Sequence, residues 1–390
     1  MSWEIRPQLD QLRAEGLWRE LRVMDSPQGP LLEHEGKSFV NFSSNDYLGL
    51  ASCDVLKAAL QDGAARYGAG SGASRLVCGS LRPHAELEAA LADFKGTEGA
   101  LTFSSGFAVP MGTLPALLGP GDTVLLDKLS HACLVDAARL SGATLRVFPH
   151  NHLEKLERLL QTAKGRVLIV TESIFSMDGD AAPLREMVAL KERYGAWLLL
   201  DEAHAVGVLG PQGRGLAAEL GLEGRIELQM GTLSKALGLS GGYLAASHAV
   251  VDLLINRARS FIYTTAPPPA VAHAALTALE MVRGEEGERR RKLLRAHVEN
   301  VQTKVGLGNT GFQSAILPLI LGDENAAMAA SAALRSAGLM VPAIRYPTVA
   351  RGRARLRLTF SAAHLPEQVE RLMEALKVLN LLHPAEAACH

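Results

Sequence analysis

Five short apolar runs, separated by segments with helical periodicity, occupy the central part of the chain and constrain its fold more than any other feature. Continuous apolar runs that alternate with helices are typical of parallel strands buried on both faces. A sixth run, Gly242–Ala246, follows after a turn too short for a helical crossover, so we expect it to pair antiparallel. The sequence therefore predicts an α/β fold with a mostly parallel sheet, whose strands lie at Thr123–Leu126, Leu145–Phe148, Val167–Val170, Trp197–Leu200 and Ile226–Met230.

The length of 390 residues exceeds what one hydrophobic core usually supports, so we expect more than one structural unit. Residues 1–24 have the pattern of an amphipathic helix and open an N-terminal helix and arm, 1–39. A large domain, 40–275, follows, and 276–390 is predicted to be a linking helix and a small C-terminal α/β domain. The linking helix contains GEEGERRRKLLRAH, whose charges we interpret as a solvated face. The strands of the small domain are predicted at Ala315–Leu321, Met340–Ile344 and Arg353–Phe360.

The overall charge narrows the class of partner. The formal net charge is −1, so no global field attracts nucleic acid or an anionic membrane. The four cysteines form no CxxC pair, which favours a reducing compartment and gives no sign of a metal site. The charged N-terminus has no apolar signal region, and no apolar run has membrane length. We expect a cytoplasmic protein that binds neither nucleic acid, membrane nor metal.

Polar residues follow four of the predicted parallel strands at the point where each strand ends. Ligands bind outside the carboxyl ends of the strands in an open parallel sheet. A single polar residue there is more often a cap or a turn residue than a catalyst. The convergence of a whole set on one edge of the sheet indicates a functional site, with candidates Asp127, His131, Glu172, Ser173, Ser176, Asp201, His204, Thr232, Ser234 and Lys235.

Lys235 is the most informative of these residues. It is one of only eleven lysines, and no other charged residue lies between Glu227 and His248. Apolar surroundings lower the pKa of a lysine, which imine formation and proton transfer require. On this motif alone, a lysine at the edge of the core whose ammonium reaches water is an equally good interpretation.

Asp201 follows four apolar strand residues, where a carboxylate is costly unless a cation or donor satisfies it. A protonated pyridine nitrogen would do so, and this pairing makes the ring of pyridoxal 5'-phosphate (PLP) an electron sink. His204, three residues later, could donate to the ring hydroxyl, and the flat ring of His131 could stack on the cofactor. Taken alone, each histidine is better explained as a structural residue.

A phosphate group needs backbone amides and hydroxyl groups. Ser104, Ser105, Gly106 and Phe107 lead into an apolar helical run, which places the free amides of a helix start beside a glycine. Thr232 adds a hydroxyl near Lys235. The sequence therefore predicts a phosphate site at Gly106 and Phe107.

Three other motifs suggest different chemistry but lack the required context. The glycine-rich segment 68–72 resembles a nucleotide loop, yet no strand precedes it. The GxSxG pattern around Ser240 would suit a serine hydrolase, but it precedes a strand instead of joining a strand to a helix. His150 and His152 suggest a metal site, although Asn151 with Glu154 is better interpreted as a helix N-cap with its capping box.

With these residues assembled, the chain resembles the α-oxoamine synthases, a family of fold-type-I PLP enzymes. Members condense an amino acid with an acyl thioester and lose carbon dioxide. The resemblance covers nearly the whole chain and rests on long motifs: NFSSNDYLGLA (41–51), GAGSGASRLVCGS (68–80), FSSGFAVPMG (103–112), SHACLVDAARLSGA (130–143), TESIFSMDGDAAPL (171–184), LLLDEAHAVGVLG (198–210), GTLSKALGLSGG (231–242) and AIRYPTVARGRARLRLTF (343–360).

The resemblance implies a role for each matching residue. Lys235 would carry the cofactor as a Schiff base, Asp201 would bind the pyridine nitrogen, and His131 would stack on the ring. His204 and Ser176 would contact the region of the ring hydroxyl. The phosphate would meet the amides of Gly106 and Phe107, the hydroxyl of Thr232, and Thr265 from the partner subunit of a homodimer. The substrate site would contain Arg345, which holds the amino-acid carboxylate, with Asn45, Arg19 and Thr348.

Within the family, NFSSNDYLGL and SGASRLVCG resemble the branch that joins L-alanine to a pimeloyl thioester, carried by CoA or by a carrier protein. Arg19, Arg22, Arg351 and Arg353 are candidates for meeting such an anion, although alternating arginines on a strand usually mark its solvent face. The alternatives are a sister enzyme that uses glycine or serine, or a different acyl chain; a serine hydrolase built on Ser240; and a non-catalytic subunit of the same fold.

Overall fold

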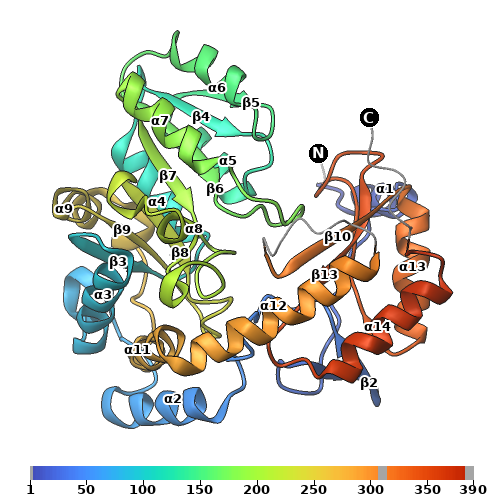
Figure 1. Ribbon diagram of the computed structural model, residues 1–390. Coiled ribbons are helices and arrows are strands. Elements are labelled where there is room, and N and C mark those ends of the chain that lie inside the picture. The colour runs from blue at the N-terminus through green and yellow to red at the C-terminus, as the bar shows by residue number, and fades with distance from the viewer. Residues whose placement is uncertain (1–2, 306–313, 383–390) are drawn as a thin grey trace.

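The computed structural model describes residues 3–305 and 314–382, and a seven-stranded sheet forms its centre (Figure 1). The strand order is β3-β9-β8-β7-β6-β4-β5, and only β9 runs antiparallel to its neighbours. The predicted mostly parallel sheet is confirmed. The strands are β3 (Gly99–Phe103), β4 (Thr123–Asp127), β5 (Thr144–Phe148), β6 (Val167–Glu172), β7 (Trp197–Asp201), β8 (Leu228–Thr232) and β9 (Gly242–Ala246).

Two details of this sheet differ from the prediction. The strand expected at Ile226–Met230 is β8, Leu228–Thr232, so Thr232 belongs to the strand itself. The edge strand β3 was not predicted, because its sequence GALTF is short and begins with glycine. Both differences concern strands that pair with β9, which has β3 on one side and β8 on the other. Thr232, at the end of β8, belongs to the predicted phosphate site.

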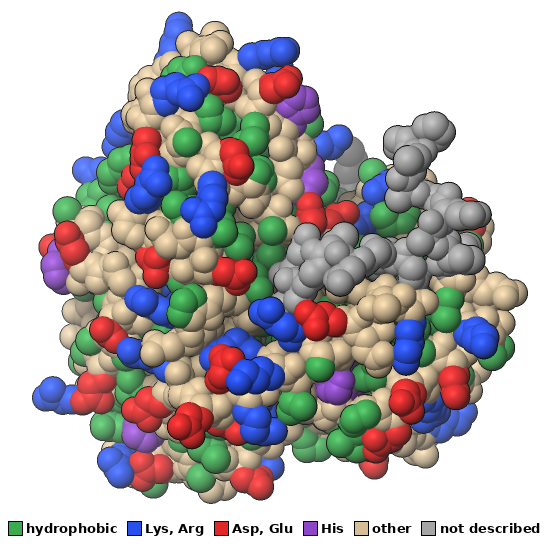
Figure 2. Space-filling view, in the orientation of Figure 1, with side chains coloured by type: hydrophobic (Ala, Val, Ile, Leu, Met, Phe, Trp, Pro, Cys, Tyr) green, Lys and Arg blue, Asp and Glu red, His purple; other side chains and the backbone are tan. Residues whose placement is uncertain are grey.

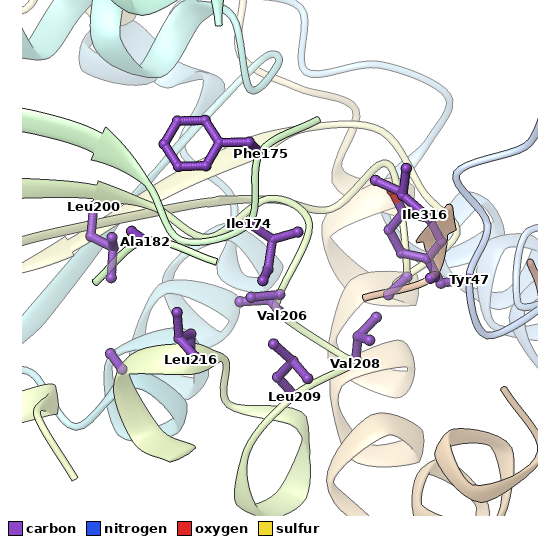
Figure 3. Packing of buried hydrophobic residues seen from close by; sticks show 14 of the residues in the cluster. Tyr47, Ile174, Phe175, Ala182, Leu200, Val206, Val208, Leu209, Leu216 and Ile316 are labelled. Atoms are coloured by element: carbon purple, nitrogen blue, oxygen red, sulfur yellow. The ribbon is translucent and has the colours of Figure 1, made fainter. Parts of the chain in front are cut away.

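Helices cover both faces of the sheet because successive strand residues point to opposite sides. In β7, Leu198 and Leu200 enter one buried cluster, and Leu199 enters the other. Figure 3 shows part of the first cluster, including Leu200, Phe175 and Val206. The helices of this region are α2 (Asp54–Tyr67), α3 (Arg82–Lys95), α4 (Ala108–Leu117), α5 (Ala132–Leu140), α6 (Leu153–Leu160), α7 (Leu184–Tyr194), α8 (Leu216–Glu219), α9 (His248–Arg257), α10 (Arg259–Ile262) and α11 (Pro269–Arg283).

Two small sheets contain the strands of the C-terminal segment, and one of them also includes two strands from near the N-terminus. One has the antiparallel order β10-β13-β12, and the other joins the hairpin β1-β2 to β11 through parallel pairing. The strand predicted at Met340–Ile344 is therefore two short strands in different sheets. The elements are β1 (Leu31–His34), β2 (Lys37–Asn41), β10 (Ile316–Gly322), β11 (Leu339–Met340), β12 (Ala343–Ile344), β13 (Ala354–Thr359), α13 (Glu324–Ser336) and α14 (Pro366–Val378).

The N-terminal helix is shorter than predicted. Helix α1 spans only Arg6–Ala14 and buries none of its residues, whereas the pattern had suggested a helix over 1–24. Gly16 has a left-handed φ of 66°, and the chain beyond it is irregular up to β1. Figure 1 shows α1 beside the C-terminal elements, far from α2 and α3.

Helix α12 (Glu285–Val305) runs from the large sheet to the C-terminal elements (Figure 1). The prediction that its charges form a solvated face is wrong for two arginines. Arg290 donates to the carbonyl of Leu48 at 2.6 Å, and the buried Arg291 donates to the carbonyl of Val282 at 2.9 Å. A local charge pattern could not predict these hydrogen bonds, because their acceptors are backbone carbonyls of other segments.

The surface shows no dominant charge. Acidic and basic side chains are interspersed over the face in Figure 2, as the net charge of −1 predicts. Within residues 3–305 and 314–382, no helix is both long and apolar enough to cross a membrane.

Candidate active site

A cavity of about 240 Å³ lies at the carboxyl ends of the parallel strands. Seven of the residues predicted for the site line it, so the convergence expected from the strand ends is present in the structure. The lining residues are Ser105, Gly106, Phe107, His131, Cys133, Glu172, Asp201, Ala203, His204, Met230, Thr232, Ser234 and Lys235.

Lys235 follows β8 and reaches the wall formed by His204. Its Nζ lies 2.7 Å from Nε2 of His204. Burial lowers the pKa of Lys235 to about 8, although the nearby carboxylates of Asp201 and Glu172 oppose the shift. A lysine with this pKa is a competent nucleophile and base near neutral pH, as its sequence context predicted.

A hydrogen-bond chain behind His204 determines the orientation of its ring. Asn45 Oδ1 accepts from Arg357 at 3.2 Å and from the hydroxyl of Tyr47 at 3.2 Å. The hydroxyl of Tyr47 donates its one proton to Asn45. In its second hydrogen bond, to His204, the hydroxyl oxygen therefore accepts from Nδ1–H. Nε2 of His204 is then the acceptor for Lys235. This assignment follows from the network, and it agrees with the pKa of His204, which burial holds well below its usual value.

Asp201 and Glu172 are paired neighbours at the ends of β7 and β6. Both side chains are buried, and burial raises the pKa of Asp201 and also that of Glu172, to about 8. Asp201 Oδ1 accepts from the amide of Ala203 at 2.9 Å, and Glu172 Oε1 has no hydrogen-bond partner among the described residues. The two buried carboxylates therefore have only Lys235 near them as a cation in the cavity lining, and a cationic ring nitrogen would stabilise them. The part of the cavity formed by Asp201 and Glu172 fits the pyridine ring of PLP.

The opposite side of the cavity suits a phosphate. Ser105, Gly106 and Phe107 precede α4, where free helix amides and the helix dipole favour an anion. Gly242 is needed for the close approach of these segments, because a Cβ on it would lie 2.7 Å from the Gly106 backbone, whereas a Cβ on Gly106 would lie in contact with Thr232 at 3.4 Å. The Thr232 hydroxyl donates to the carbonyl of Gly241 at 2.8 Å. These residues fit the phosphate of PLP.

His131 is the N-cap of α5 and accepts from the amide of Cys133 at 3.3 Å. This bond anchors the ring at the cavity wall. Burial lowers the pKa of His131, so its ring is neutral near pH 7. A flat, neutral ring in this place can stack on an aromatic cofactor.

Six residues to which the family resemblance assigned roles do not line this cavity. The carbonyl of Ser176 accepts from Arg357 at 2.6 Å, and Asn45 belongs to the chain behind His204. The guanidinium of Arg345 is bonded to the carbonyls of Gly16 and Trp18, the latter at 3.3 Å. The remaining three are exposed on the subunit surface, and their roles stay predictions: Arg19, Thr265 and Thr348.

Sequence reasoning missed Tyr47 and Arg357. Glu172 was among the strand-end candidates, and it lines the cavity beside Asp201, with which it pairs. Arg351 and Arg353, for which a solvent face was the alternative interpretation, are exposed, whereas Arg355 and Arg357 in the adjoining strand β13 are only 3% and 5% exposed. The capping box predicted at Asn151 is wrong, since His152 caps α6 by accepting from the amide of Lys155.

The chain belongs to the aminotransferase class I and II family, whose model matches residues 37–376. Several curated relatives carry the name 8-amino-7-oxononanoate synthase. The protein of Geobacter sulfurreducens is 48% identical over 381 residues, 96% of this chain and 97% of that protein. The protein of Anaeromyxobacter sp. (strain K) is 49% identical, over 99% of this chain and 98% of its own.

Solved structures agree in fold. A serine palmitoyltransferase from S. paucimobilis, with a bound PLP–myriocin aldimine, has a TM-score of 0.90 at 30% identity and covers 97% of this chain and 98% of its own. The 8-amino-7-oxononanoate synthase from Francisella tularensis has a TM-score of 0.74 at 28% identity, over 88% of this chain and 98% of its own. The predicted family and fold-type-I architecture are confirmed.

Proposed function

We propose that this protein is a PLP-dependent acyltransferase that condenses L-alanine with a pimeloyl thioester. The products are 8-amino-7-oxononanoate, carbon dioxide and the free thiol, a reaction of biotin biosynthesis. The observation that carries the proposal is Lys235, a lysine of lowered pKa in a cavity with the buried carboxylate of Asp201. The full-length identity of 48% to proteins named for this product supports the choice of substrates.

The residues around the cavity would hold PLP in one orientation. Asp201 would pair with the ring nitrogen, His131 would cover a ring face, and Lys235 would bind the aldehyde carbon. The phosphate would lie against Gly106 and Phe107, with the hydroxyl of Thr232. When bound, PLP supplies an electron sink for the charge that develops at the substrate α-carbon.

The protein itself moves the protons. The amine of Lys235 removes the α-proton of alanine, because its lowered pKa leaves an appreciable unprotonated fraction near pH 7 to 8. Nε2 of His204 accepts from Nζ and holds it in the cavity. The α-carbon of alanine then attacks the thioester carbonyl, and the thiol leaves. After carbon dioxide is lost, the proton on Nζ returns to the α-carbon.

Two arginines are candidates for the carboxylate of alanine. Arg345 was predicted for this role, but its guanidinium is bonded to the N-terminal segment. Arg357 is buried, and its hydrogen bond to Asn45 joins it to the chain that leads through Tyr47 to His204, which places it close to the reacting groups. Arg357 is the better-placed residue. We expect Arg357→Lys to raise the KM for alanine more than Arg345→Lys does, and a larger effect of Arg345→Lys would favour Arg345 as the direct partner.

The proposed active unit is a homodimer with shared sites. Val77 and Tyr263 are 78% and 71% exposed, unusual for large apolar side chains. Their segments lie together, because the amide of Ala266 donates to the carbonyl of Ala73 at 3.0 Å. Thr265, beside them, would reach the phosphate of the partner subunit. Mixing Lys235→Ala with Thr265→Ala protein should restore partial activity, and an active monomer in sedimentation would contradict the shared site.

Arg19 and Thr348 would line the entrance for the acyl thioester, carried by CoA or by a carrier protein. Both are exposed, as contact with a large carrier requires. We place the enzyme in the cytoplasm, where both carriers and PLP are available.

The deciding experiment measures thiol release for a matrix of amino acids and acyl thioesters. L-Alanine with pimeloyl-CoA should give the highest kcat/KM. Glycine should be poor but detectable, because one methyl group in a pocket contributes only about 1–3 kcal/mol of discrimination. A second candidate is serine with a long acyl chain, which the TM-score of 0.90 to serine palmitoyltransferase favours. A higher kcat/KM for that pair would replace alanine and the pimeloyl group in the proposal.

A further inference from the structure

His150 lies outside the residues that line the cavity, and the proposed mechanism does not use it. Its two ring nitrogens each face a carboxylate: Nδ1 lies 3.1 Å from Asp127 Oδ1, and Nε2 lies 2.8 Å from Asp180 Oδ2. A neutral imidazole has one N–H and could satisfy only one of them. Both contacts together require an imidazolium that donates twice. Burial alone would lower the pKa of His150, but the hydrogen bonds to Asp127 and Asp180 raise it to about 10.

These three side chains, the imidazolium clamp, join segments that follow three neighbouring strands. Asp127 is the last residue of β4, His150 comes two residues after β5, and Asp180 lies in the loop after β6. Asp127 also accepts from the amides of Leu129 and Asn151, each at 2.8 Å. The clamp therefore holds the turn after β4 and the loop after β6 against the end of β5.

The neighbours of the clamp make it rigid. The His150 ring packs edge-to-face on the buried ring of Phe175, with centroids 4.3 Å apart. The amide of Phe175 donates to the carbonyl of Asp180 at 3.0 Å. Asp127 is fully buried, and His150 is its only ion-pair partner within the described residues. Loss of the imidazolium would leave that carboxylate buried without a cation, which is strongly unfavourable.

Both clamped segments continue into the cavity. The turn after β4 ends at His131, which would cover the cofactor ring. The loop after β6 begins beside Glu172, which ends that strand and also lines the cavity.

We propose that His150 is a positioning residue whose imidazolium clamp sets the distance between the cavity walls at His131 and at Glu172, and so orients the cofactor ring. This inference rests on the proposed function, because the orientation is read through bound PLP. A misplacement of 1 Å at a reacting centre can cost about 100-fold in rate. The clamp would act on kcat and on cofactor geometry, and much less on the KM for the thioester.

The test uses full-length His150→Gln, which keeps one donor and one acceptor but cannot donate twice. Asp180→Asn is the milder second variant, because that side chain is 38% exposed and removal of its charge preserves its shape. Asp122→Asn is the matched control: Asp122 lies at the opposite end of the β4 segment and pairs with Arg166 at 2.7 Å, away from the cavity. Three measurements are made on each protein: PLP affinity, visible circular dichroism of bound PLP, and hydrogen exchange of the 127–131 and 172–182 segments without cofactor.

We expect His150→Gln to lose exchange protection in both segments, to bind PLP about tenfold more weakly, and to change the visible dichroism of the bound cofactor. Asp180→Asn should show the same changes at smaller size, and Asp122→Asn should show none. Unchanged dichroism and affinity in a folded clamp variant, with only thermal stability lowered, would overturn the proposal. If His150→Gln does not fold, Asp180→Asn decides by the same criteria. Failure of the unsubstituted protein to bind PLP would instead refute the proposed function.

Discussion

The two ends of the central sheet carry two different hollows, and the larger one is not the candidate active site. At the amino ends of β6 and β7 lies a cavity of about 500 Å³, against about 240 Å³ at the carboxyl ends. The larger cavity is mostly apolar, and is lined by Leu117, Leu118, Arg166, Val167, Leu168, Gly195, Trp197, Ser247, Ala249, Val250 and Leu253. Volume alone would have selected the wrong end of the sheet.

The difference between the two ends lies in the state of their charges. At the amino end, Arg166 pairs with Asp122 at 2.7 Å, and the hydrogen bonds from Arg166 lower the pKa of Asp122 to about 2. At the carboxyl end, burial dominates: it lowers the pKa of Lys235 and raises the pKa of Asp201. Charged groups that form ion pairs within the protein stabilise it. Groups whose pKa values burial shifts toward neutral pH can exchange protons and are available for chemistry.

The sharpest test of this comparison is removal of Lys235. Lys235→Ala should lower kcat at least about 10³-fold, because it removes both the imine-forming amine and the proton carrier. Borohydride reduction of the unsubstituted holoenzyme, followed by peptide mapping, should place the pyridoxyl label on Lys235. A label on another lysine would refute the assignment.

The next largest effect is expected at Asp201. Asp201→Asn keeps the size of the side chain but cannot hold a protonated ring nitrogen, so α-proton exchange of alanine with solvent should fall about 10²–10³-fold. The exchange is followed by proton NMR in D₂O, with retained cofactor absorbance as the control for binding. Exchange at the unsubstituted rate would mean that Asp201 is only structural.

The clamp predicts a stability effect on the alkaline side. The pKa of His150 is raised from an ordinary 6.5 to about 10 in the folded protein. Its contribution is therefore fully present below pH 6.5 and is lost as the pH rises to 10. The difference in unfolding free energy between the unsubstituted protein and His150→Gln should shrink by about 2 kcal/mol over this window. Denaturant unfolding at pH 6, 8 and 10 measures it, and a constant difference would contradict an imidazolium at this position.

The smallest effect belongs to the amino end. Asp122→Asn should lower the unfolding free energy at pH 7 by about 1 kcal/mol and leave kcat/KM unchanged. Because the folded pKa of Asp122 is lowered from 3.8 to about 2, this contribution is present above pH 3.8 and is lost as the pH falls through 2. Acid unfolding curves and the thiol-release assay check both parts. A marked loss of activity would break the distinction between the two ends.

Lys235 and Asp201 could be predicted because each directly follows a buried parallel strand, and such strand ends meet at one edge. Tyr47 and Arg357 could not be found in this way. Tyr47 lies in an irregular segment before α2, and it meets His204 across 157 residues of chain. Arg357 continues a run of alternating arginines whose first members are exposed, and it is buried because β13 packs against the segments that contain Asn45 and Ser176.

The sequence by itself determined the alternation of strands and helices, the edge of the sheet that binds ligand, and the isolated lysine. Each depends on residues close together in the chain, where the period of apolar side chains is sufficient evidence. Only the tertiary structure decided which nitrogen of His204 accepts, which arginine is buried, and that His150 is shared between Asp127 and Asp180. Those outcomes depend on the directions of hydrogen bonds between segments far apart in the chain, and no local pattern specifies them.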